Sequence, residues 1–296
     1  MDPITSAGFA FIALVGLPVV VLFLQVFVAL RGDRGSEAVL LRARPRVAVL
    51  MPAHDEAEVI EQTLRRLIPQ LAPGDRVLVV ADNCTDNTAV LALSAGAQVV
   101  RRLDFERRGK SYALEFGVRH LALDAPEVVI VIDADCHVEP GAIDVLAREC
   151  AARDRPVQSL YLMHSPEANG LPGQVAAFAW RVKNWVRPLG LRNLGFACQL
   201  MGTGTAFPWS AVQHFPIANR EMAEDYKFGI DLARTGYAPH FCPEARVWSE
   251  FPVNARAVRS QRTRWEHGHL NLIVREVPKL LVQGLMRRDV QLVGLA

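Results

Sequence analysis

Short apolar runs alternate with segments of helical periodicity from residue 46 to residue 164. The runs are almost continuously apolar, which is typical of strands whose two faces are covered by helices. Strand, helix and strand in alternation favour right-handed crossovers and parallel pairing. The pattern therefore predicts an α/β fold with a Rossmann-like, mostly parallel sheet and helices on both faces. The expected strands cover 46–53, 76–82, 97–102, 127–135 and 157–163, and the expected helices cover 56–71, 86–96, 109–123 and 140–154.

This alternation stops near residue 165. Residues 270–296 mix apolar and basic positions without an uninterrupted run long enough to cross a bilayer, so we expect an amphipathic segment at a membrane interface. Between these points we expect a helix over 172–189, a turn rich in glycine and threonine over 201–207, and helices over 221–236 and 258–270.

The N-terminal segment predicts a membrane anchor. Residues 4–30 carry no charge and exceed the roughly 20 apolar residues that span a bilayer. A signal peptide is the competing interpretation, but a basic n-region and a small-residue cleavage site are missing. Arginines follow the segment while only Asp2 precedes it, so the positive-inside rule places the rest of the chain in the cytoplasm. We expect one transmembrane helix within residues 1–31 and a basic juxtamembrane linker over 32–45.

Composition narrows the class of protein. Hydrophobic residues make up 51% of the 296 positions, which excludes a disordered chain. The formal net charge is only +2, so no overall field indicates nucleic acid as a partner. The five cysteines form no CxxC pair, and their odd number favours free thiols in a reducing compartment over a disulfide framework.

Two carboxylates, Asp133 and Asp135, end the apolar run "VVIVIDAD". Alternate residues of an extended chain point to the same side, so the two side chains can converge on one ligand. Mg²⁺ or Mn²⁺ held by carboxylates and substrate phosphates is a common arrangement for hard cations. The alternative interpretation is a solvated turn whose acids cap a helix.

Polar clusters also follow the first three expected strands, and ligands of such sheets bind beyond the carboxyl ends of the strands. Asp82 lies at the end of the second strand, where its carboxylate could accept the imide N–H of a uracil ring. Lys110 in "ERRGKSYAL" begins a helix and could reach a phosphate there, although a solvated basic loop explains the same residues.

Further candidates lie in the second half of the chain. Glu224 and Asp225 begin a helix, where the helix dipole would stabilise them, and one of them could instead act as a general base. Gln261, Arg264 and Trp265 share one helical face that could bind a diphosphate beside a sugar ring. A core tryptophan beside a solvated arginine is the alternative.

In this order, the motifs "PAHDE", "DNCTD", "RGK", "DAD", "ED" and "QxxRW" resemble the family 2 glycosyltransferases, most closely the membrane-bound branch with cellulose-synthase-like and ceramide-glucosyltransferase-like members. The resemblance runs over residues 46–269. It implies the fold of type A glycosyltransferases, with a nucleotide-binding half over 46–164 and an acceptor and catalytic half over 165–269.

The resemblance also implies roles for individual residues. The donor is usually a uridine diphosphate sugar, and the sugar is transferred with inversion at the anomeric carbon. In the family, the matching residues are Pro52, Ala53, Glu56 and Asp82 for the nucleoside, Lys110 near the base and phosphates, Asp133 near the ribose and donor sugar, Asp135 as metal ligand, Asp225 as general base, and Gln261, Arg264 and Trp265 for the diphosphate and acceptor end.

This sequence departs from the family pattern in three places. Asp55 stands where asparagine is usual, and Ala81, Asp82 and Asn83 stand where two acids and a glycine are usual, so the base preference is less secure. Polymerising relatives carry several membrane spans, whereas one is clear here. Either sugar is added to a lipid-linked acceptor without export, or further spans follow in a longer chain.

We therefore expect a membrane-associated, metal-dependent, inverting hexosyltransferase that moves a sugar from a nucleotide donor to a glycan or lipid-linked acceptor. Cell-envelope polysaccharide or glycolipid synthesis is the expected setting. Two alternatives are transfer of one sugar to a polyprenyl phosphate, and a membrane-tethered sensor of nucleotide sugars without turnover. The sugar, the acceptor, the choice between Mg²⁺ and Mn²⁺ and any protein partner are not specified by the sequence.

Overall fold

The computed structural model describes most of the chain. For several residues inside its helices, only the backbone is described. The backbone is described for residues 3–32, 43–214, 217–218, 221, 223–253 and 255–296, and within these the side chains of 3–14, 255–258, 260–262 and 264–265 lie outside the described part.

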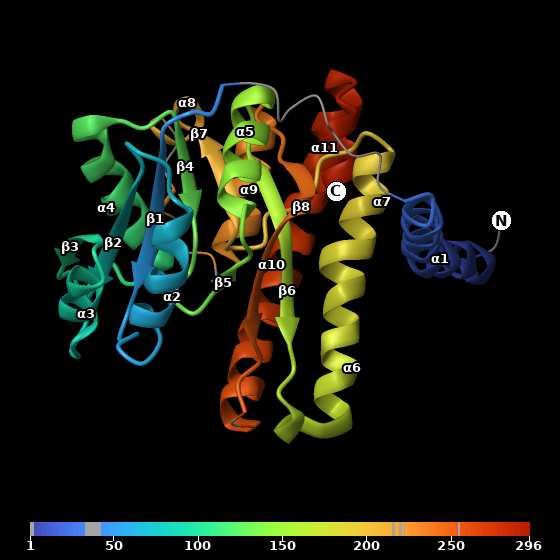
Figure 1. Ribbon diagram of the computed structural model, residues 1–296. Helices are drawn as coiled ribbons and strands as arrows, with labels where there is room; N and C mark the ends of the chain where they lie inside the picture. The colour runs from blue at the N-terminus through green and yellow to red at the C-terminus, as the bar shows by residue number, and fades with distance from the viewer. Residues whose placement is uncertain (1–2, 33–42, 215–216, 219–220, 222, 254) are drawn as a thin grey trace.

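Eight strands form one mixed sheet. They are β1 (Val47–Ala53), β2 (Arg76–Asp82), β3 (Gln98–Arg102), β4 (Val128–Val131), β5 (His137–Val138), β6 (Val157–His164), β7 (Thr205–Pro208) and β8 (His240–Glu250). Their order across the sheet is β3-β2-β1-β4-β7-β6-β8-β5 (Figure 1). The first four strands in this order are parallel, which confirms the pairing predicted for them.

The other half of the sheet differs from the prediction. β7 is antiparallel to both β4 and β6, so it separates two strands that we expected in one parallel series. Its residues, Thr205–Pro208, fall largely within the expected Gly/Thr turn, and β8 was not predicted at all. β8 pairs in parallel with β6 and antiparallel with β5. The described sheet is therefore mixed, with four parallel and three antiparallel pairings, so parallel pairing still predominates as predicted.

Helices cover both faces of the sheet, as predicted (Figure 1). Successive residues of β1 point to opposite faces of the sheet. Val49 belongs to the hydrophobic core on one face, and Leu50 belongs to the core on the other. The first face is covered by α2 (Ile60–Leu67), α3 (Thr88–Ser94) and α5 (Ala142–Arg153), and the second by α4 (Lys110–Leu121), α8 (Trp209–Val212) and α9 (Glu224–Arg234).

The helix α4 lies unusually close to the sheet because of Gly117. A Cβ at this position would lie 2.4 Å from the Cδ1 of Leu50 and 2.9 Å from the Cγ2 of Val80. Both neighbours are fully buried side chains of β1 and β2. Gly117 therefore sets the depth at which α4 packs, and with it the position of Lys110 at the start of the helix.

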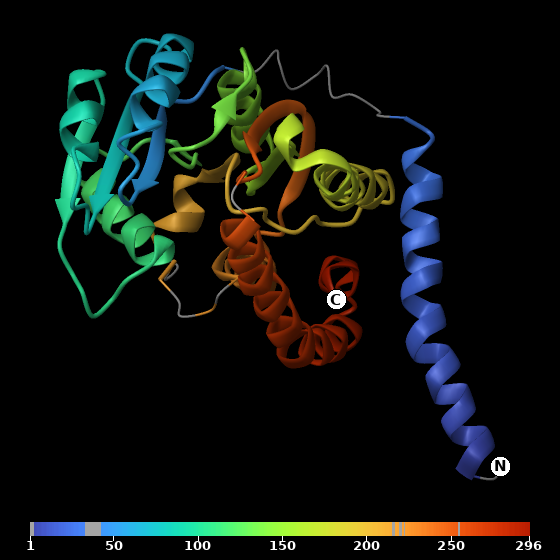
Figure 2. The same cartoon turned by 90° about the horizontal axis from the view of Figure 1, so that it is seen from below.

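Further helical segments follow residue 165 (Figure 2). The helix expected over 172–189 is continuous but contains a π-helical turn, and the helix expected over 258–270 is much longer. The C-terminal helix packs on the domain through Leu292 and Leu295. These elements are α6 (Gly170–Arg181), the π-helical η5 (Val182–Val186), α7 (Arg187–Asn193), α10 (Ala255–Arg287) and α11 (Val290–Leu295).

The N-terminal helix α1 (Pro3–Ala29) packs against α7, at the end of the molecule opposite β3 (Figure 2). Gly190 lies against the α1 backbone, and a Cβ there would come within 2.0 Å of the Gln25 carbonyl oxygen. The buried Gln25 accepts a hydrogen bond of 2.9 Å from the Arg187 Nε. The close backbone contact at Gly190 and the hydrogen bond between Arg187 and Gln25 together hold the C-terminal part of α1 on the domain.

In the part of the chain whose side chains are described, which leaves out residues 1–14, no helix is both long and apolar enough to cross a membrane. The transmembrane helix predicted within residues 1–31 is therefore not confirmed.

Replacing Gly117 with alanine should test the close packing of α4. The added methyl group would overlap Leu50, so we expect the free energy of unfolding to fall by about 1–3 kcal/mol. Chemical denaturation would measure the change. Arg119→Ala on the exposed side of the same helix is the control, and an equal stability of the two variants would contradict the packing role.

Candidate active site

The four polar clusters that follow the first four strands meet at one rim of the sheet, as predicted. They line a cleft of about 660 Å³. Parallel strands bring their carboxyl ends to the same edge, which explains the convergence. The lining residues are Pro52, Ala53, His54, Asp55 and Glu56 from the end of β1, Asp82, Asn83 and Thr85 from β2, Phe105, Arg108, Gly109, Lys110 and Ala113 after β3, and Asp133, Ala134 and Asp135 after β4.

Asp133 and Asp135 converge, but not for the reason we expected. β4 ends at Val131, so the two acids lie in an irregular segment rather than on one extended strand. The backbone N–H of Asp133 donates to the Thr203 hydroxyl at 3.0 Å, and the N–H of Cys136 donates to the Asp133 carbonyl at 3.1 Å. Ligand atoms of Asp133, Asp135 and Cys136 all lie within 4.8 Å of one another.

The acids of this rim are electrostatically crowded. Burial raises the pKa of Glu56 to about 7, and the negative charges of Asp135 and Asp133 contribute to the rise. Burial also raises the pKa of Asp133, against the effect of Lys110. Carboxylate oxygens are the ligands that Mg²⁺ and Mn²⁺ prefer, and a divalent charge would offset this repulsion. The donor set therefore fits a hard cation held by Asp133 and Asp135.

Lys110 connects the acid group to the start of α9. Its Nζ lies 2.5 Å from the Asp133 Oδ1 and donates to the Gly202 carbonyl at 2.9 Å. Gly202 has a φ of +84° and lies beside Asp225: a Cβ there would be 3.3 Å from the Asp225 Oδ2. Lys110 thus joins Asp133 to the Gly202 backbone beside Asp225, and it lines one small cavity together with Asp225.

Asp225 lies in an environment that suits a base. It lines a small cavity of about 40 Å³ with Glu224, Lys110 and Gly202, and apolar side chains such as Phe228 complete the wall. Burial, followed by the charge of Glu224, raises the pKa of Asp225 to about 7, while Lys110 and Lys183 act in the opposite direction. A carboxyl group with such a pKa can accept and release a proton near neutral pH.

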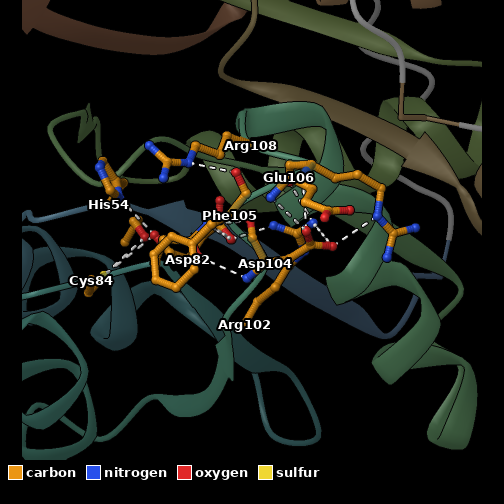
Figure 3. A network of polar contacts seen from close by, with 11 residues as sticks. His54, Asp82, Cys84, Arg102, Asp104, Phe105, Glu106 and Arg108 are labelled. Carbon is orange, nitrogen blue, oxygen red and sulfur yellow. Dashed lines mark hydrogen bonds and ion pairs between the residues drawn. The ribbon is translucent and has the colours of Figure 1, made fainter.

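Asp82 takes part in a buried network (Figure 3). Its Oδ1 accepts a hydrogen bond of 2.7 Å from the Arg102 Nη1 and one of 3.1 Å from the Asn83 Nδ2. Arg102 also pairs with Asp104 at 3.1 Å and donates to the Arg107 carbonyl at 2.7 Å. These contacts fix the orientation of Asp82. Removing one partner of such a buried pair typically costs about 3–5 kcal/mol of stability.

The predicted "QxxRW" residues remain untested. Gln261, Arg264 and Trp265 belong to α10, but their side chains lie outside the described residues. Their roles stay predictions.

Sequence reasoning missed Arg102, Gly202 and Thr203. Arg102 is the last residue of β3 and is buried, and a buried charged residue needs a partner. Gly202 and Thr203 lie in the "MGTGT" segment that we interpreted only as a turn. Two glycines around a threonine are a signal of close backbone approach, and the structure places both residues against the acids of the site.

Comparison with known proteins decides the family. Residues 45–268, well over half of the chain, match the family described as "Glycosyltransferase like family 2". The chain belongs to this family. The match confirms the predicted family. It does not test the predicted cellulose-synthase-like branch or the individual motifs.

Curated relatives of this family 2 domain are longer proteins. The probable glycosyltransferase YdaM of Bacillus subtilis (strain 168) is 28% identical over 262 residues, which cover 79% of this chain and 58% of that protein. The poly-beta-1,6-N-acetyl-D-glucosamine synthase of Staphylococcus aureus (strain COL) is 24% identical over 254 residues, 78% of this chain and 56% of that protein. The chain therefore spans a little over half the length of these relatives.

A solved structure confirms the fold. The mannosyltransferase PcManGT from Pyrobaculum calidifontis, in complex with GDP-Man and Mn²⁺, matches with a TM-score of 0.64 at 20% sequence identity. The match covers 87% of this chain and 72% of that one. The predicted type of glycosyltransferase fold is thus present, and this neighbour carries a manganese ion together with a nucleotide sugar.

Replacing Asp135 with asparagine should weaken Mn²⁺ binding by about tenfold or more, because one charged oxygen ligand is lost and even supporting residues of metal sites contribute 10- to 100-fold. Calorimetric titration with Mn²⁺, with and without a nucleoside diphosphate, would measure this. Asp154→Asn is the control, since Asp154 lies at the exposed end of α5 with a φ of 47° that asparagine tolerates. Unchanged Mn²⁺ affinity in Asp135→Asn would contradict the site.

Proposed function

We propose that this domain transfers a sugar from a nucleoside diphosphate donor, expected to be a uridine diphosphate sugar, to a hydroxyl group of a glycan or lipid-linked acceptor. The observation that carries the proposal is the position of Asp225, whose pKa is near 7, in a cavity that it lines together with Lys110, the partner of Asp133. Family membership supports sugar transfer. The S. aureus relative, a polysaccharide synthase by name, supports a role in polysaccharide or glycolipid synthesis.

Asp225 is the general base of the proposed reaction. It takes the proton of the acceptor hydroxyl, whose oxygen then forms a bond to the anomeric carbon of the donor sugar. The bond from that carbon to the diphosphate breaks, and the nucleoside diphosphate leaves with the electron pair. Attack from the face opposite the leaving group inverts the anomeric configuration, and the base is worth about 10²- to 10⁴-fold in rate.

The leaving diphosphate would lie in the main cleft, where positive charge is available. Lys110 lines this cleft at the start of α4 and is already oriented by Asp133 and the Gly202 carbonyl. A divalent cation bound by Asp133 and Asp135 would neutralise charge that develops on the diphosphate. Arg264 of α10 is a further predicted contributor.

Asp225→Asn should leave donor binding nearly intact and reduce transfer by 100-fold or more, because an amide cannot accept the proton. Release of the nucleoside diphosphate measures transfer, and calorimetry with the donor measures binding. Asp231→Asn in the same helix, which is paired with Lys227 and half exposed, is the matched control. A fully active Asp225→Asn variant would remove Asp225 from the role.

The reaction should also depend on pH through Asp225. Only the ionised carboxylate accepts a proton, so kcat/KM should fall as the pH drops below about 7. Lys183 lowers the pKa of Asp225, so Lys183→Met should move this limb of the pH profile to higher pH. Lys227→Met, whose cation is paired with Asp231, should leave the limb in place. A profile flat down to pH 5 would argue against this base.

We further propose that the domain works at a membrane surface. Apolar side chains of α1 between Val15 and Leu30 are largely exposed, and so are Ile273, Val274 and Leu285 of α10. Exposed apolar surface on this scale typically marks a binding interface. A lipid-linked acceptor would be presented at such a surface.

Introducing charge into α1 should test membrane association. Phe23→Asp, at a side chain that is 64% exposed, should sharply reduce flotation of the protein with vesicles of phosphatidylglycerol and phosphatidylcholine. Leu123→Asp is the control, because Leu123 is equally apolar and 83% exposed but follows α4 at another part of the molecule. Equal flotation of both variants and the unmodified protein would contradict a membrane role for this face.

A further inference from the structure

The carboxylate of Asp82 presents only one free oxygen to the cleft. Each carboxylate oxygen offers two lone pairs, and both lone pairs of Oδ1 are used by Arg102 and Asn83. Among the residues that the structure describes, none donates a hydrogen bond to Oδ2. Asp82 lines the cleft, so Oδ2 is the acceptor that a bound base would meet.

The nucleobases place different demands on such an acceptor. The pairing edge of guanine presents two adjacent donors, N1–H and N2–H, which a carboxylate satisfies only with both oxygens. Uracil presents a single N3–H donor between two carbonyl oxygens. If both oxygens of the carboxylate were free, the one that does not accept the N3–H would repel a uracil carbonyl oxygen. A carboxylate oxygen that is paired with a guanidinium repels this carbonyl less.

We propose that Arg102 determines the base specificity of the donor site, by occupying one oxygen of Asp82 and so favouring uracil over guanine. This inference rests on the proposed function, because it assumes that the cleft binds a nucleoside diphosphate sugar. It assigns a selecting role to a residue that lies behind Asp82 and need not touch the base. Arg102 is therefore a positioning residue.

The surroundings of Arg102 make the arrangement rigid. Its second terminal nitrogen is held by the Asp104 carboxylate and the Arg107 carbonyl, and its guanidinium carbon lies 5.8 Å from the centre of the Tyr112 ring. Asn83 also accepts a hydrogen bond of 2.8 Å from the Asp104 backbone N–H. Arg102 thus cannot turn away from Asp82 without breaking contacts to the loop after β3 (Figure 3).

The same loop carries two exposed residues at the mouth of the cleft. Arg108 lies over the Phe105 ring at 5.3 Å, and its Nε donates to the Phe105 carbonyl at 3.0 Å. Both residues line the cleft. A base held by Asp82 would find a flat aromatic and cationic surface there, which favours stacking for any base and leaves discrimination to the Asp82 edge.

Competition between UDP and GDP in the presence of Mn²⁺ tests the proposal on the unmodified protein. Calorimetry should give UDP an affinity about tenfold or more above that of GDP, because one guanine donor would be left without a partner. Equal affinities, or tighter binding of GDP, would overturn the base selection while leaving nucleotide binding intact. Binding of neither nucleotide by the folded protein would overturn the proposed function as well.

Arg102→Gln should release Oδ1 and reduce the UDP-to-GDP affinity ratio, and Arg101→Gln is the matched control. Arg101 precedes it on the same strand with an exposed side chain, so the ratio should stay unchanged there. Thermal unfolding shows whether each variant is folded. A folded Arg102→Gln protein with the original ratio would overturn the proposal.

Asp82→Asn provides a second route should Arg102→Gln fail to fold. Arg102 requires an acceptor, so the amide oxygen should face it and the amide nitrogen should face the cleft. The site would then offer a donor to the uracil N–H, and UDP affinity should fall to about the level of GDP. Retention of the UDP preference in this variant would contradict recognition through Oδ2.

Discussion

The ion pair between Lys110 and Asp133 is the interaction on which the arrangement of the site depends. The rim gathers acids from the ends of several strands, and burial together with the charges of Asp135 and Asp133 raises the pKa of Glu56. Lys110 supplies a positive charge among them and is half-buried, so its charge is only weakly screened. Its position follows from α4, which Gly117 allows to lie deep against the sheet. Packing far from the cleft thus fixes a charge inside it.

The cleft combines two kinds of polar organisation. On the side predicted to bind the nucleoside, Asp82, Arg102 and Asp104 form a closed network in which nearly every donor has a partner. On the side of the predicted metal ligands, Asp133 and Asp135 bring two carboxylates to the cleft against the one ammonium group of Lys110, which leaves an excess of negative charge. A closed network suits recognition, because its groups cannot rearrange to fit a wrong ligand. Unbalanced charge suits a site that is completed only when a cation and a diphosphate bind.

The parallel half of the fold could be predicted because its strands are short, apolar and separated by amphipathic helices. The convergence of the four polar clusters followed from this alone. The antiparallel half could not be predicted in the same way: β7 has four residues within a glycine-rich stretch, and its pairing with both β4 and β6 is a long-range contact without a local signal. Asp133 and Asp135 were placed on a strand that ends earlier, because "VIVID" is apolar beyond the last ladder pair. Arg102 was missed because its main partner, Asp82, ends the neighbouring strand β2, and the sequence alone does not show which strands are neighbours.

The insertion of β7 has a mechanical consequence. It is hydrogen-bonded to β4 on one side and to β6 on the other, so the segments before and after residue 165 share one continuous ladder. The parts of the chain before and after residue 165 therefore cannot move apart as rigid bodies without breaking main-chain hydrogen bonds of the sheet. Any adjustment of the cleft to a substrate would therefore fall to the loops that line it, such as the segment that carries Phe105 and Arg108.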